Sequence, residues 1–209
     1  MDFTLSKEHE MARALFREFA EKEVKPLAIE VDETEVFPRE TVEKMAKAGF
    51  MGIPVPKEYG GQGCDVLTYA MCVEELAKVC GTTAVIVSAH TSLCCDPILT
   101  FGTEDQKKKY LPDLASGKKI GAFGLTEPGA GTDAQGQQTK AVLDGDEWVL
   151  NGSKIFITNG KEADVYVIFA ITGMVEKRGR MTKEISAFIV EKGTCLLYTS
   201  PSPRDRSVS

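Results

Sequence analysis

The stretch FGLTEPGAGTD, residues 123–133, follows an apolar run that begins near Ile120 and stands where the chain changes its pattern. Before it, apolar residues recur at helical spacing, whereas past Gly117 they alternate as they do in strands. A glycine-rich turn at the end of a strand exposes backbone N–H groups, which commonly hold an anion or the polar edge of a cofactor. The stretch therefore separates two regions of different class and is itself a candidate binding loop.

Upstream of this stretch, residues 1–118 are predicted to form an all-α domain. Residues suited to N-caps, and glycines or prolines suited to helix ends, bracket each apolar pattern. A T-x-x-Q capping box precedes the last helix. The expected helices run from Ser6 to Pro26, from Pro38 to Gly49, from Asp65 to Gly81, through AVIVSAHTSLCC to Pro97, and onward from Thr103–Gln106.

Downstream, residues 119–194 are predicted to form an antiparallel, barrel-like β domain, so the fold class is α+β. The expected strands are KIGAFGLT, TKAVL, EWVL, KIFIT, VYVIFAI and ISAFIV. Residues 174–183 have the composition of an exposed loop between strands. Hairpin turns are expected where paired residues tolerate positive φ, at Asp144-Gly145, Asn151-Gly152 and Asn159-Gly160.

The overall composition limits the possible functions. A formal net charge of −6 argues against nucleic-acid binding, which needs a basic face to replace phosphate counterions. The first residues lack the apolar core of a signal peptide, and the longest apolar run, residues 165–171, is too short to span a bilayer. Six cysteines without a C-x-x-C pair, and only two histidines, predict no metal site. We therefore expect a soluble, cytoplasmic protein with no membrane span.

Three interpretations of the glycine-rich stretch can be compared. A Walker loop needs a lysine after its last glycine, and Thr132 stands there instead. Gly129, Gly131 and Ala134 fit the spelling G-x-G-x-x-A, but a dinucleotide fold needs a crossover helix next. The sequence continues instead with the hairpin pattern TKAVLDGDEWVL. On composition alone, a surface loop without a ligand stays open as the third interpretation.

Four segments together resemble one enzyme family. TEPGAGTD is followed downstream by NGSKIFITNG and preceded by PVPKEYGGQG and GTEDQKKKYLPDLASGKKIGAF. In this order and spacing, over residues 3–194, they closely resemble the flavin-dependent acyl-CoA dehydrogenases, most of all the short-chain or butyryl-CoA enzymes. Four ordered motifs are far more specific than one glycine-rich loop. The resemblance implies that the binding loop serves FAD and an acyl-CoA.

The resemblance also assigns roles to residues in two of these segments. Thr126 would bind the pyrimidine edge of the flavin, and Thr158 would lie where negative charge builds as hydride arrives. Thr132 matches the position that contacts the acyl-CoA substrate. Phe156 replaces the tryptophan of many relatives, which keeps aromatic packing but loses the indole N–H. The FAD contacts implied in this way are Phe123, Leu125, Thr126, Phe156, Ile157 and Thr158.

The family's reaction is implied as well. Such an enzyme oxidises a fatty acyl-CoA to the trans-2-enoyl-CoA in β-oxidation, by α-proton abstraction and β-hydride transfer to FAD. It passes electrons to an electron-transfer flavoprotein and is a homotetramer when complete. Its catalytic base is a glutamate in a C-terminal helical domain, so no catalytic residue is assigned here and the chain is expected to be an inactive fragment. The alternatives are an acyl-CoA oxidase, an enoyl-CoA reductase, or a non-catalytic acyl-CoA or flavin binding module.

Three titratable residues are not given a catalytic role. His90 lies in an apolar helix without a nucleophile or ligand set, so it is expected to be a packed or pocket-lining residue. Glu127 and Asp133 flank the glycine-rich turn and are expected to be structural, as the resemblance implies.

Residues 195–209 depart from the family pattern. CLLYTSPSPRDRSVS is rich in serine, proline and arginine, lacks strand alternation, and reads like translated adaptor DNA. It is predicted to be a non-native, disordered tail. The chain is therefore expected to be truncated before the last strands of the β domain and before the C-terminal helical bundle.

Overall fold

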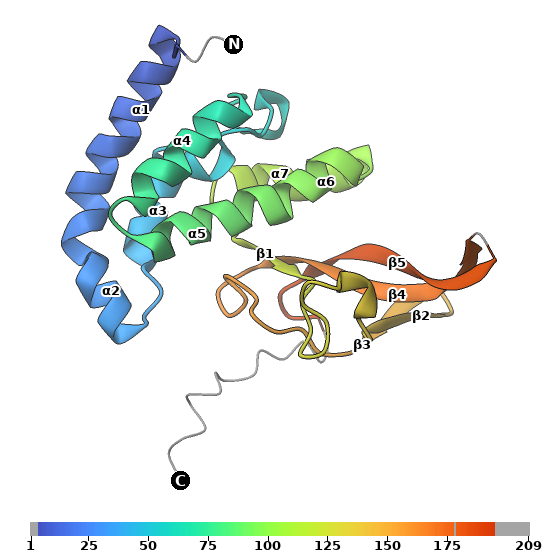
Figure 1. Cartoon of the computed structure of the whole chain (residues 1–209). Helices are drawn as coiled ribbons and strands as arrows, with labels where there is room; N and C mark the ends of the chain where they lie inside the picture. The colour runs from blue at the N-terminus through green and yellow to red at the C-terminus, as the bar shows by residue number, and fades with distance from the viewer. Residues whose placement is uncertain (1–3, 178, 195–209) are drawn as a thin grey trace.

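A computed structural model describes residues 4–177 and 179–194 and shows a helical layer standing on a mixed β-sheet (Figure 1). Helices occupy the first part of the described chain and strands the second. The predicted α+β fold, with an α domain followed by a β domain, is confirmed. The predicted tail at residues 195–209 lies outside the described residues.

Side-chain caps start several of the helices, as the sequence predicts. Ser6 accepts a hydrogen bond from the backbone of α1, and Asp65 does the same for α4. Thr103 and Gln106 form the complete capping box of α7. The helices are α1 (Lys7–Phe19), α2 (Ala28–Thr34), α3 (Arg39–Lys47), α4 (Val66–Ala77), α5 (Gly81–Ser88), α6 (Asp96–Phe101) and α7 (Glu104–Ala115).

Two prolines do not end their helices, contrary to the prediction. Pro26 lies in a 3-10 turn that follows a π-helical turn and leads into α2. Pro97 is the second residue of α6, which continues from the π-helical turn at residues 89–95. Proline is tolerated in a first turn because the missing N–H has no intrahelical partner there. Each change of helix type therefore lets the chain continue through the proline.

The resulting helical segment, Gly81–Phe101, is long and apolar enough to cross a membrane by length and composition alone. Half of it is buried inside the protein. It packs against α4, α7 and the first strand of the sheet. This placement is that of the core helix of the helical layer.

The sheet is mixed rather than purely antiparallel. Its strands are β1 (Gly121–Gly124), β2 (Lys140–Asp144), β3 (Glu147–Asn151), β4 (Val165–Lys177) and β5 (Arg180–Glu191). The pairs β2–β3 and β4–β5 are antiparallel, but β1 and β2 both pair with β4 in parallel. The prediction of an all-antiparallel sheet is therefore wrong in this respect. Hairpin signals specify neighbouring strands only, and the β1–β4 pair joins distant parts of the sequence.

Three local predictions in this region also differ from the structure. The stretch KIFIT forms no strand, and Asn159-Gly160 forms no hairpin, because the chain there is irregular. Asn151 ends β3 without a hairpin after it. Of the stretch expected as a loop at residues 174–183, residues 174–177 extend β4 and residues 180–183 belong to its partner β5. Only the turn at Asp144-Gly145 joins two strands as predicted, with Gly145 at a φ of 61°.

One apolar cluster fills the helical layer, and a second joins that layer to the sheet. The first fills the helical layer around Phe50, whose ring centroid lies 5.1 Å from Phe16 and 4.8 Å from Phe19. The second lies between α7 and the sheet and includes Leu111 and Val165. The two layers therefore meet in this second cluster, to which residues 89–95 and α7 both contribute.

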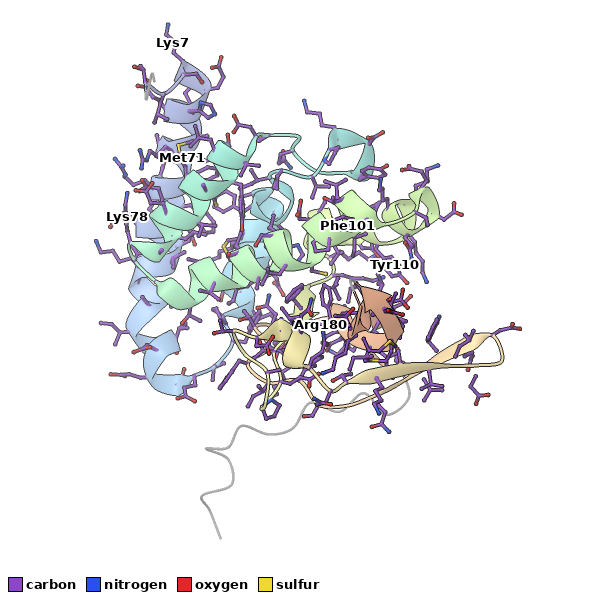
Figure 2. The ribbon with its side chains drawn as sticks, turned by 45° about the vertical axis from the view of Figure 1, so that its right-hand side comes forward. Lys7, Met71, Lys78, Phe101, Tyr110 and Arg180 are labelled. Carbon is purple, nitrogen blue, oxygen red and sulfur yellow. The ribbon has the colours of Figure 1, made fainter. Side chains whose placement is uncertain are left out.

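Polar contacts add to this junction at its outer end. Tyr110, labelled in Figure 2, donates its hydroxyl to Glu191 of β5 at 2.9 Å. Lys109 donates to the same carboxylate oxygen at 2.6 Å. Hydrogen bonds from Lys109 and then Tyr110 lower the pKa of Glu191. The last strand is therefore fixed to the end of the helical layer.

Candidate functional site

The glycine-rich stretch forms a tight turn shortly after β1. Glu127 and Ala130 close it through two backbone hydrogen bonds, each 3.0 Å long. A Cβ atom added at Gly129 or Gly131 would meet nothing within 4 Å, and neither residue has a positive φ. Nothing in the described protein therefore requires glycine at these two positions. The turn has room for another molecule to approach its backbone closely.

A second segment, residues 154–159, lies beside this turn without joining the sheet. At its start, the Ile155 N–H donates to the Thr126 carbonyl at 2.9 Å. At its end, the buried Asn159 amide donates to the Gly121 carbonyl of β1 at 3.1 Å and to a carbonyl of α5 at 3.2 Å. These contacts hold both ends of the segment against β1 and the residues that follow it.

Between its anchors the segment presents an aromatic ring and a hydroxyl. Phe156 has a φ of 59° and is 85% exposed, which is a strained backbone conformation for an aromatic residue. Thr126 and Thr158 are partly buried, and neither hydroxyl has a hydrogen-bond partner within residues 4–177 and 179–194. A flat ring system with donors and acceptors along one edge would find both an aromatic surface and hydroxyl partners here. The residues present therefore fit a flavin ring.

Two of the predicted site residues lie apart from this group. The ring of Phe123 faces the helical layer and packs against Phe169, with 5.2 Å between ring centroids. Thr132 is exposed in the loop beyond the turn. The structure brings together the remaining predicted residues at the end of β1 and in the neighbouring segment, namely Leu125, Thr126, Phe156, Ile157 and Thr158.

A buried ion pair lies behind the turn. The side chains of Lys154 and Glu127 are 10% and 6% exposed, and Nζ lies 2.9 Å from Oε1. Burial raises the pKa of Glu127, but hydrogen bonds from Thr139, Gln138 and Lys154 outweigh it and lower the pKa to about 2. The carboxylate is therefore ionised at neutral pH and engaged on both oxygens. It is structural, as the sequence predicts, and not placed to exchange a proton with a substrate.

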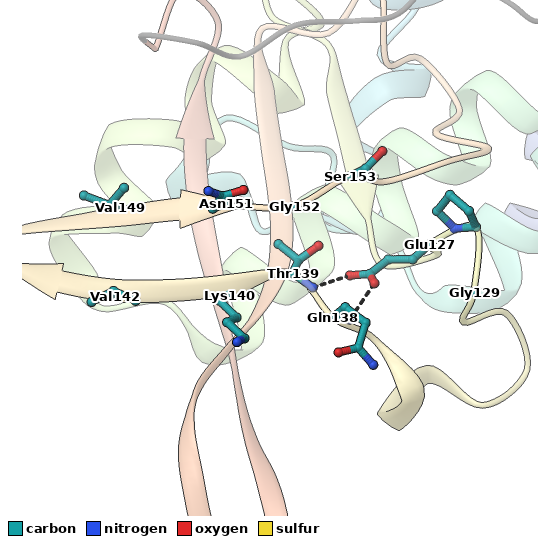
Figure 3. A pocket seen from close by; sticks show the side chains of 11 residues that line it. Glu127, Gly129, Gln138, Thr139, Lys140, Val142, Val149, Asn151, Gly152 and Ser153 are labelled. Carbon is teal, nitrogen blue, oxygen red and sulfur yellow. Dashed lines mark hydrogen bonds between the residues drawn. The ribbon is translucent and has the colours of Figure 1, made fainter.

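An open groove of about 650 Å³ runs between the turn and the β2–β3 hairpin (Figure 3). Figure 3 shows the Glu127 carboxylate on one wall, receiving the N–H groups of Gln138 and Thr139. Neither Thr126 nor Thr158 lines this groove. Because its carboxylate is satisfied by the protein itself, we assign the candidate site to the two threonine hydroxyls and the open side of the turn, not to the groove.

His90 lies fully buried beneath the start of β1. Its Nδ1 accepts from the Gly121 N–H at 2.9 Å, and its Nε2 lies 3.1 Å from the Leu114 carbonyl. The ring is therefore neutral, with its hydrogen on Nε2 donated to Leu114. Burial lowers the pKa of His90 to about 4. His90 is a packed residue that joins the two layers, as the sequence predicts.

No group of three His, Cys, Asp or Glu side chains within residues 4–177 and 179–194 is placed to hold a metal ion. The cysteines of this part of the chain are all free thiols, and only Cys64 is exposed. Their burial raises the pKa of the Cys72 and Cys94 thiols to about 12. These two thiols are therefore protonated at neutral pH and have little nucleophilic character.

Sequence reasoning did not single out Lys154 or its partner Gln137. The available signal was a lone lysine inside the short apolar stretch KIFIT. Lysine is rarely buried in proteins. In a strand pattern such a residue is normally assigned to the solvent side, so its burial could not be read from the pattern.

The fold and the site together define an α+β protein with a candidate binding loop where its helical and sheet layers meet. Comparison with known families gives a match over both layers. A model of the acyl-CoA dehydrogenase N-terminal domain matches residues 6–118, and a model of the middle domain matches residues 122–202. The chain belongs to the acyl-CoA dehydrogenase family. The resemblance carried by the four sequence segments is thereby confirmed.

Individual relatives agree with this result. A short-chain specific acyl-CoA dehydrogenase of Clostridium acetobutylicum is 64% identical over 193 residues, which cover 92% of this chain and 50% of that protein. Butyryl-CoA dehydrogenase from Megasphaera elsdenii matches with a TM-score of 0.85 at 46% identity, over 93% of this chain and 51% of that one. An acyl-CoA dehydrogenase of Bacillus anthracis, complexed with FAD, gives a TM-score of 0.84 at 39% identity, over 94% and 33%. The chain spans about half the length of the curated relatives it matches.

Proposed function

We propose that this chain forms two domains, residues 1–118 and 119–194, of a longer FAD-dependent acyl-CoA dehydrogenase. The longer protein oxidises a fatty acyl-CoA to the trans-2-enoyl-CoA. Bound FAD supplies the acceptor for the β-hydrogen, which leaves the substrate as hydride. The observation that carries the proposal is that the hydroxyls of Thr126 and Thr158 have no hydrogen-bond partner among the described residues and flank the exposed ring of Phe156, in a member of this family.

Each residue of the group has a role suited to its chemistry. Thr126 and the Leu125 backbone offer hydrogen bonds to the polar edge of the ring system. Thr158 would donate toward the side of the ring where negative charge develops, which would favour the arrival of hydride. Phe156 and Ile157 exclude water from it. Phe123 contributes through the backbone of β1, because its ring faces the helical layer.

The acyl-CoA is proposed to lie along the open side of the turn, with Thr132 as its contact in this chain. The base that removes the α-proton is proposed to lie in the part of the longer protein outside this chain. This fits the residues at hand, since Glu127 is engaged on both oxygens and His90 is fully buried. An electron-transfer flavoprotein as electron acceptor, a homotetrameric assembly and a cytoplasmic location belong to the same proposal.

Anaerobic titration with butyryl-CoA tests the proposal. The longer protein is expected to bind FAD and to lose its visible flavin absorption when the thioester is added. The 209-residue chain is expected to show no such reduction, because the base is proposed to lie outside it. Full reduction by the short chain would place the base within it, and failure of the longer protein to bind FAD would contradict the proposed function.

Further measurements on the longer protein distinguish the dehydrogenase from the three alternative functions. Rapid reoxidation by oxygen, in preference to an electron-transfer flavoprotein, would identify an acyl-CoA oxidase. Faster turnover of the enoyl-CoA than of the acyl-CoA would identify a reductase. Binding of FAD and acyl-CoA without any reduction in the longer protein would leave a non-catalytic binding module.

Thr158→Val in the longer protein is expected to raise the dissociation constant of FAD by about threefold to tenfold, because one hydroxyl donor is lost at constant shape. Flavin fluorescence during a titration measures this constant. Thr82→Val is the matched control, since Thr82 is exposed in α5, outside the candidate site. Equal dissociation constants for Thr158→Val and the unmodified protein would remove Thr158 from the site.

A further inference from the structure

The Lys154 side chain uses every donor of its ammonium group. Nζ donates to the Leu125 carbonyl, to Oε1 of Glu127 and to Oε1 of Gln137, each at 2.9 Å. An ammonium has three N–H donors, so none is left for a ligand or for water. A buried charge is costly unless it is paired and hydrogen-bonded, and here it is both. The geometry is that of a fixed internal support.

The carboxylate opposite this ammonium is just as fully engaged. Glu127 accepts from the Gln138 N–H at 2.6 Å and from the Thr139 N–H at 2.9 Å, besides Lys154. These hydrogen bonds keep the pKa of Glu127 low, at about 2, in spite of its burial. The pair is therefore ionised across the neutral range. Through it Lys154 connects the turn, the start of β2 and residues 154–159.

The contact with the Leu125 carbonyl has a consequence for its neighbour. The carbonyl of Leu125 and the N–H of Thr126 belong to one planar trans peptide unit and point in opposite directions. When Lys154 holds that carbonyl, it also sets the direction of the Thr126 N–H. The next peptide unit is held as well, because the Thr126 carbonyl accepts from the Ile155 N–H at 2.9 Å. Thr126 is therefore fixed on both sides by residues 154 and 155.

The conformation of residues 154–158 also depends on Lys154. Residues 154–158 belong to no strand or helix, so no ladder of backbone hydrogen bonds holds them. Phe156 is kept at a φ of 59°, a conformation that persists only where the surroundings impose it. The imposing contacts are Lys154 and Ile155 before it and Asn159 after it. Without the ammonium, the hydrogen bond that remains at the start of this segment, among the described residues, is the one from the Ile155 N–H to the Thr126 carbonyl.

We propose that Lys154 is a positioning residue for the flavin ring: its ammonium fixes the spacing and orientation of the two segments that carry Thr126 and Thr158. This inference rests on the proposed function, because it takes these threonines as flavin contacts. Lys154 itself has no donor left for the cofactor, because all three are used within the protein. It acts through the Leu125–Thr126 peptide and through Glu127, and Glu127 in turn holds the start of β2.

Three variants of the longer protein separate positioning from a purely structural role. They are Lys154→Met, Glu127→Gln, and the double variant that carries both. Lys154→Met leaves a buried carboxylate without its cation and lowers the thermal unfolding midpoint. The double variant has no unpaired buried charge, so it is expected to recover much of that midpoint. The Leu125 carbonyl still lacks its donor in the double variant.

If Lys154 positions the flavin contacts, the double variant is expected to recover thermal stability but not flavin binding. Lys154→Met and the double variant are both expected to raise the FAD dissociation constant by about tenfold to a hundredfold, the scale for losing a charge-assisted hydrogen bond. Both are also expected to shift the visible absorption band and the midpoint potential of the bound flavin. If Lys154→Met does not fold, the double variant carries the same test.

Arg13→Met is the matched control. Arg13 pairs at 2.9 Å with Glu75, which is 2% exposed, and the pair joins α1 to α4 in the helical layer. Its loss lowers stability without touching the turn, so the FAD dissociation constant and the flavin spectrum are expected to stay unchanged. A control that weakens FAD binding as much as Lys154→Met does would overturn the proposal. Recovery of FAD binding together with stability in the double variant would overturn it too.

The outcomes also show whether the positioning role of Lys154 or the proposed function is at fault. If the unmodified longer protein binds no FAD, the proposed function is wrong. If the unmodified protein binds FAD and Lys154→Met binds it equally well with an unchanged spectrum, only the positioning role is wrong.

Discussion

Gly61→Ala is expected to lower the free energy of unfolding by about 3 kcal/mol, at the upper end of the cost of overpacking. Gly61 lies in the loop between α3 and α4, within the segment PVPKEYGGQG. A Cβ atom at this position would stand 2.0 Å from the Val55 carbonyl oxygen and 2.5 Å from its carbonyl carbon. Both are backbone atoms, so no side-chain rotation relieves the clash, and the loop itself must move.

That movement breaks a compact set of hydrogen bonds. Gln62, Gly63 and Cys64 donate their N–H groups to the carbonyls of Gly52, Val55 and Ile53, each at 2.9 Å. Val55 is also buried in the cluster between α7 and the sheet. A shift at Gly61 therefore disturbs both the loop and the contact between the layers. The close approach of two backbones explains why glycine is required here.

Chemical denaturation measures the effect, with Gly81→Ala as the control. A Cβ atom at Gly81 would meet nothing within 4 Å, and the residue lies in the first turn of α5. Alanine there is expected to leave the free energy of unfolding unchanged or to raise it by up to about 1 kcal/mol. Equal destabilisation by the two substitutions would show that the backbone contact at Gly61 carries no special cost.

The parts of the fold that sequence predicts well are those fixed by neighbours in the chain. The caps at Ser6, Asp65 and Thr103 depend on residues three positions away, and all are present. The turn at Gly145 likewise needs only a residue that tolerates positive φ between two short strands. Such signals are local and survive whatever packing surrounds them.

Predictions failed where distant contacts outweigh local preference. KIFIT has the apolar and β-branched composition of a short strand, yet Lys154 and Asn159 hold it to parts of the chain far away in sequence. The parallel pairing of β1 with β4 is also non-local, and no hairpin signal specifies it. In both cases the missing information lies in tertiary contacts. The misplaced helix end at Pro26 has a local cause, because a 3-10 turn accommodates the proline and the chain stays helical.

In the candidate site, too, sequence motifs were informative, whereas features that depend on distant contacts were not predicted. Thr126 and Thr158 were predicted as site residues through the resemblance, because they lie within its ordered motifs. The separation of the Phe123 ring from them could not be found in this way, since it depends on which face of β1 meets the helices. Lys154 was missed because the burial of a lysine follows from its three acceptors, which come from separate parts of the chain.

Acid is expected to weaken the contact between the helical layer and β1 through His90. Its Nδ1 is the acceptor for the Gly121 N–H, and a protonated ring has no acceptor left. Protonation of Nδ1 in the folded state would therefore point its N–H at the Gly121 N–H, so that two donors face each other in a fully buried site. This explains why the folded protein resists it and why burial lowers the pKa of His90 to about 4.

The sign of the effect follows from the two pKa values. An imidazole in the unfolded chain has a pKa of about 6.5, above the folded value of about 4. Between these values the unfolded state binds the proton more strongly, so the free energy of unfolding falls as the pH falls. The contribution is fully present above about pH 6.5, and the loss due to His90 reaches about 3 kcal/mol by pH 4.

Urea denaturation measures the free energy of unfolding of the unmodified protein and of His90→Gln between pH 7 and pH 4. The difference between the two proteins isolates the contribution of His90. The variant is less stable at neutral pH, because glutamine cannot reproduce both ring contacts, but it has no group to titrate at this position. The advantage of the unmodified protein is therefore expected to shrink by about 3 kcal/mol over this range. The carboxylates of Glu75 and Glu127, with pKa values of about 2, lose their contribution as the pH falls below about 4.5 in both proteins and cancel in the difference. A difference that stays constant with pH would mean that His90 is protonated as readily in the folded protein as in the unfolded chain, which its two buried hydrogen bonds do not allow.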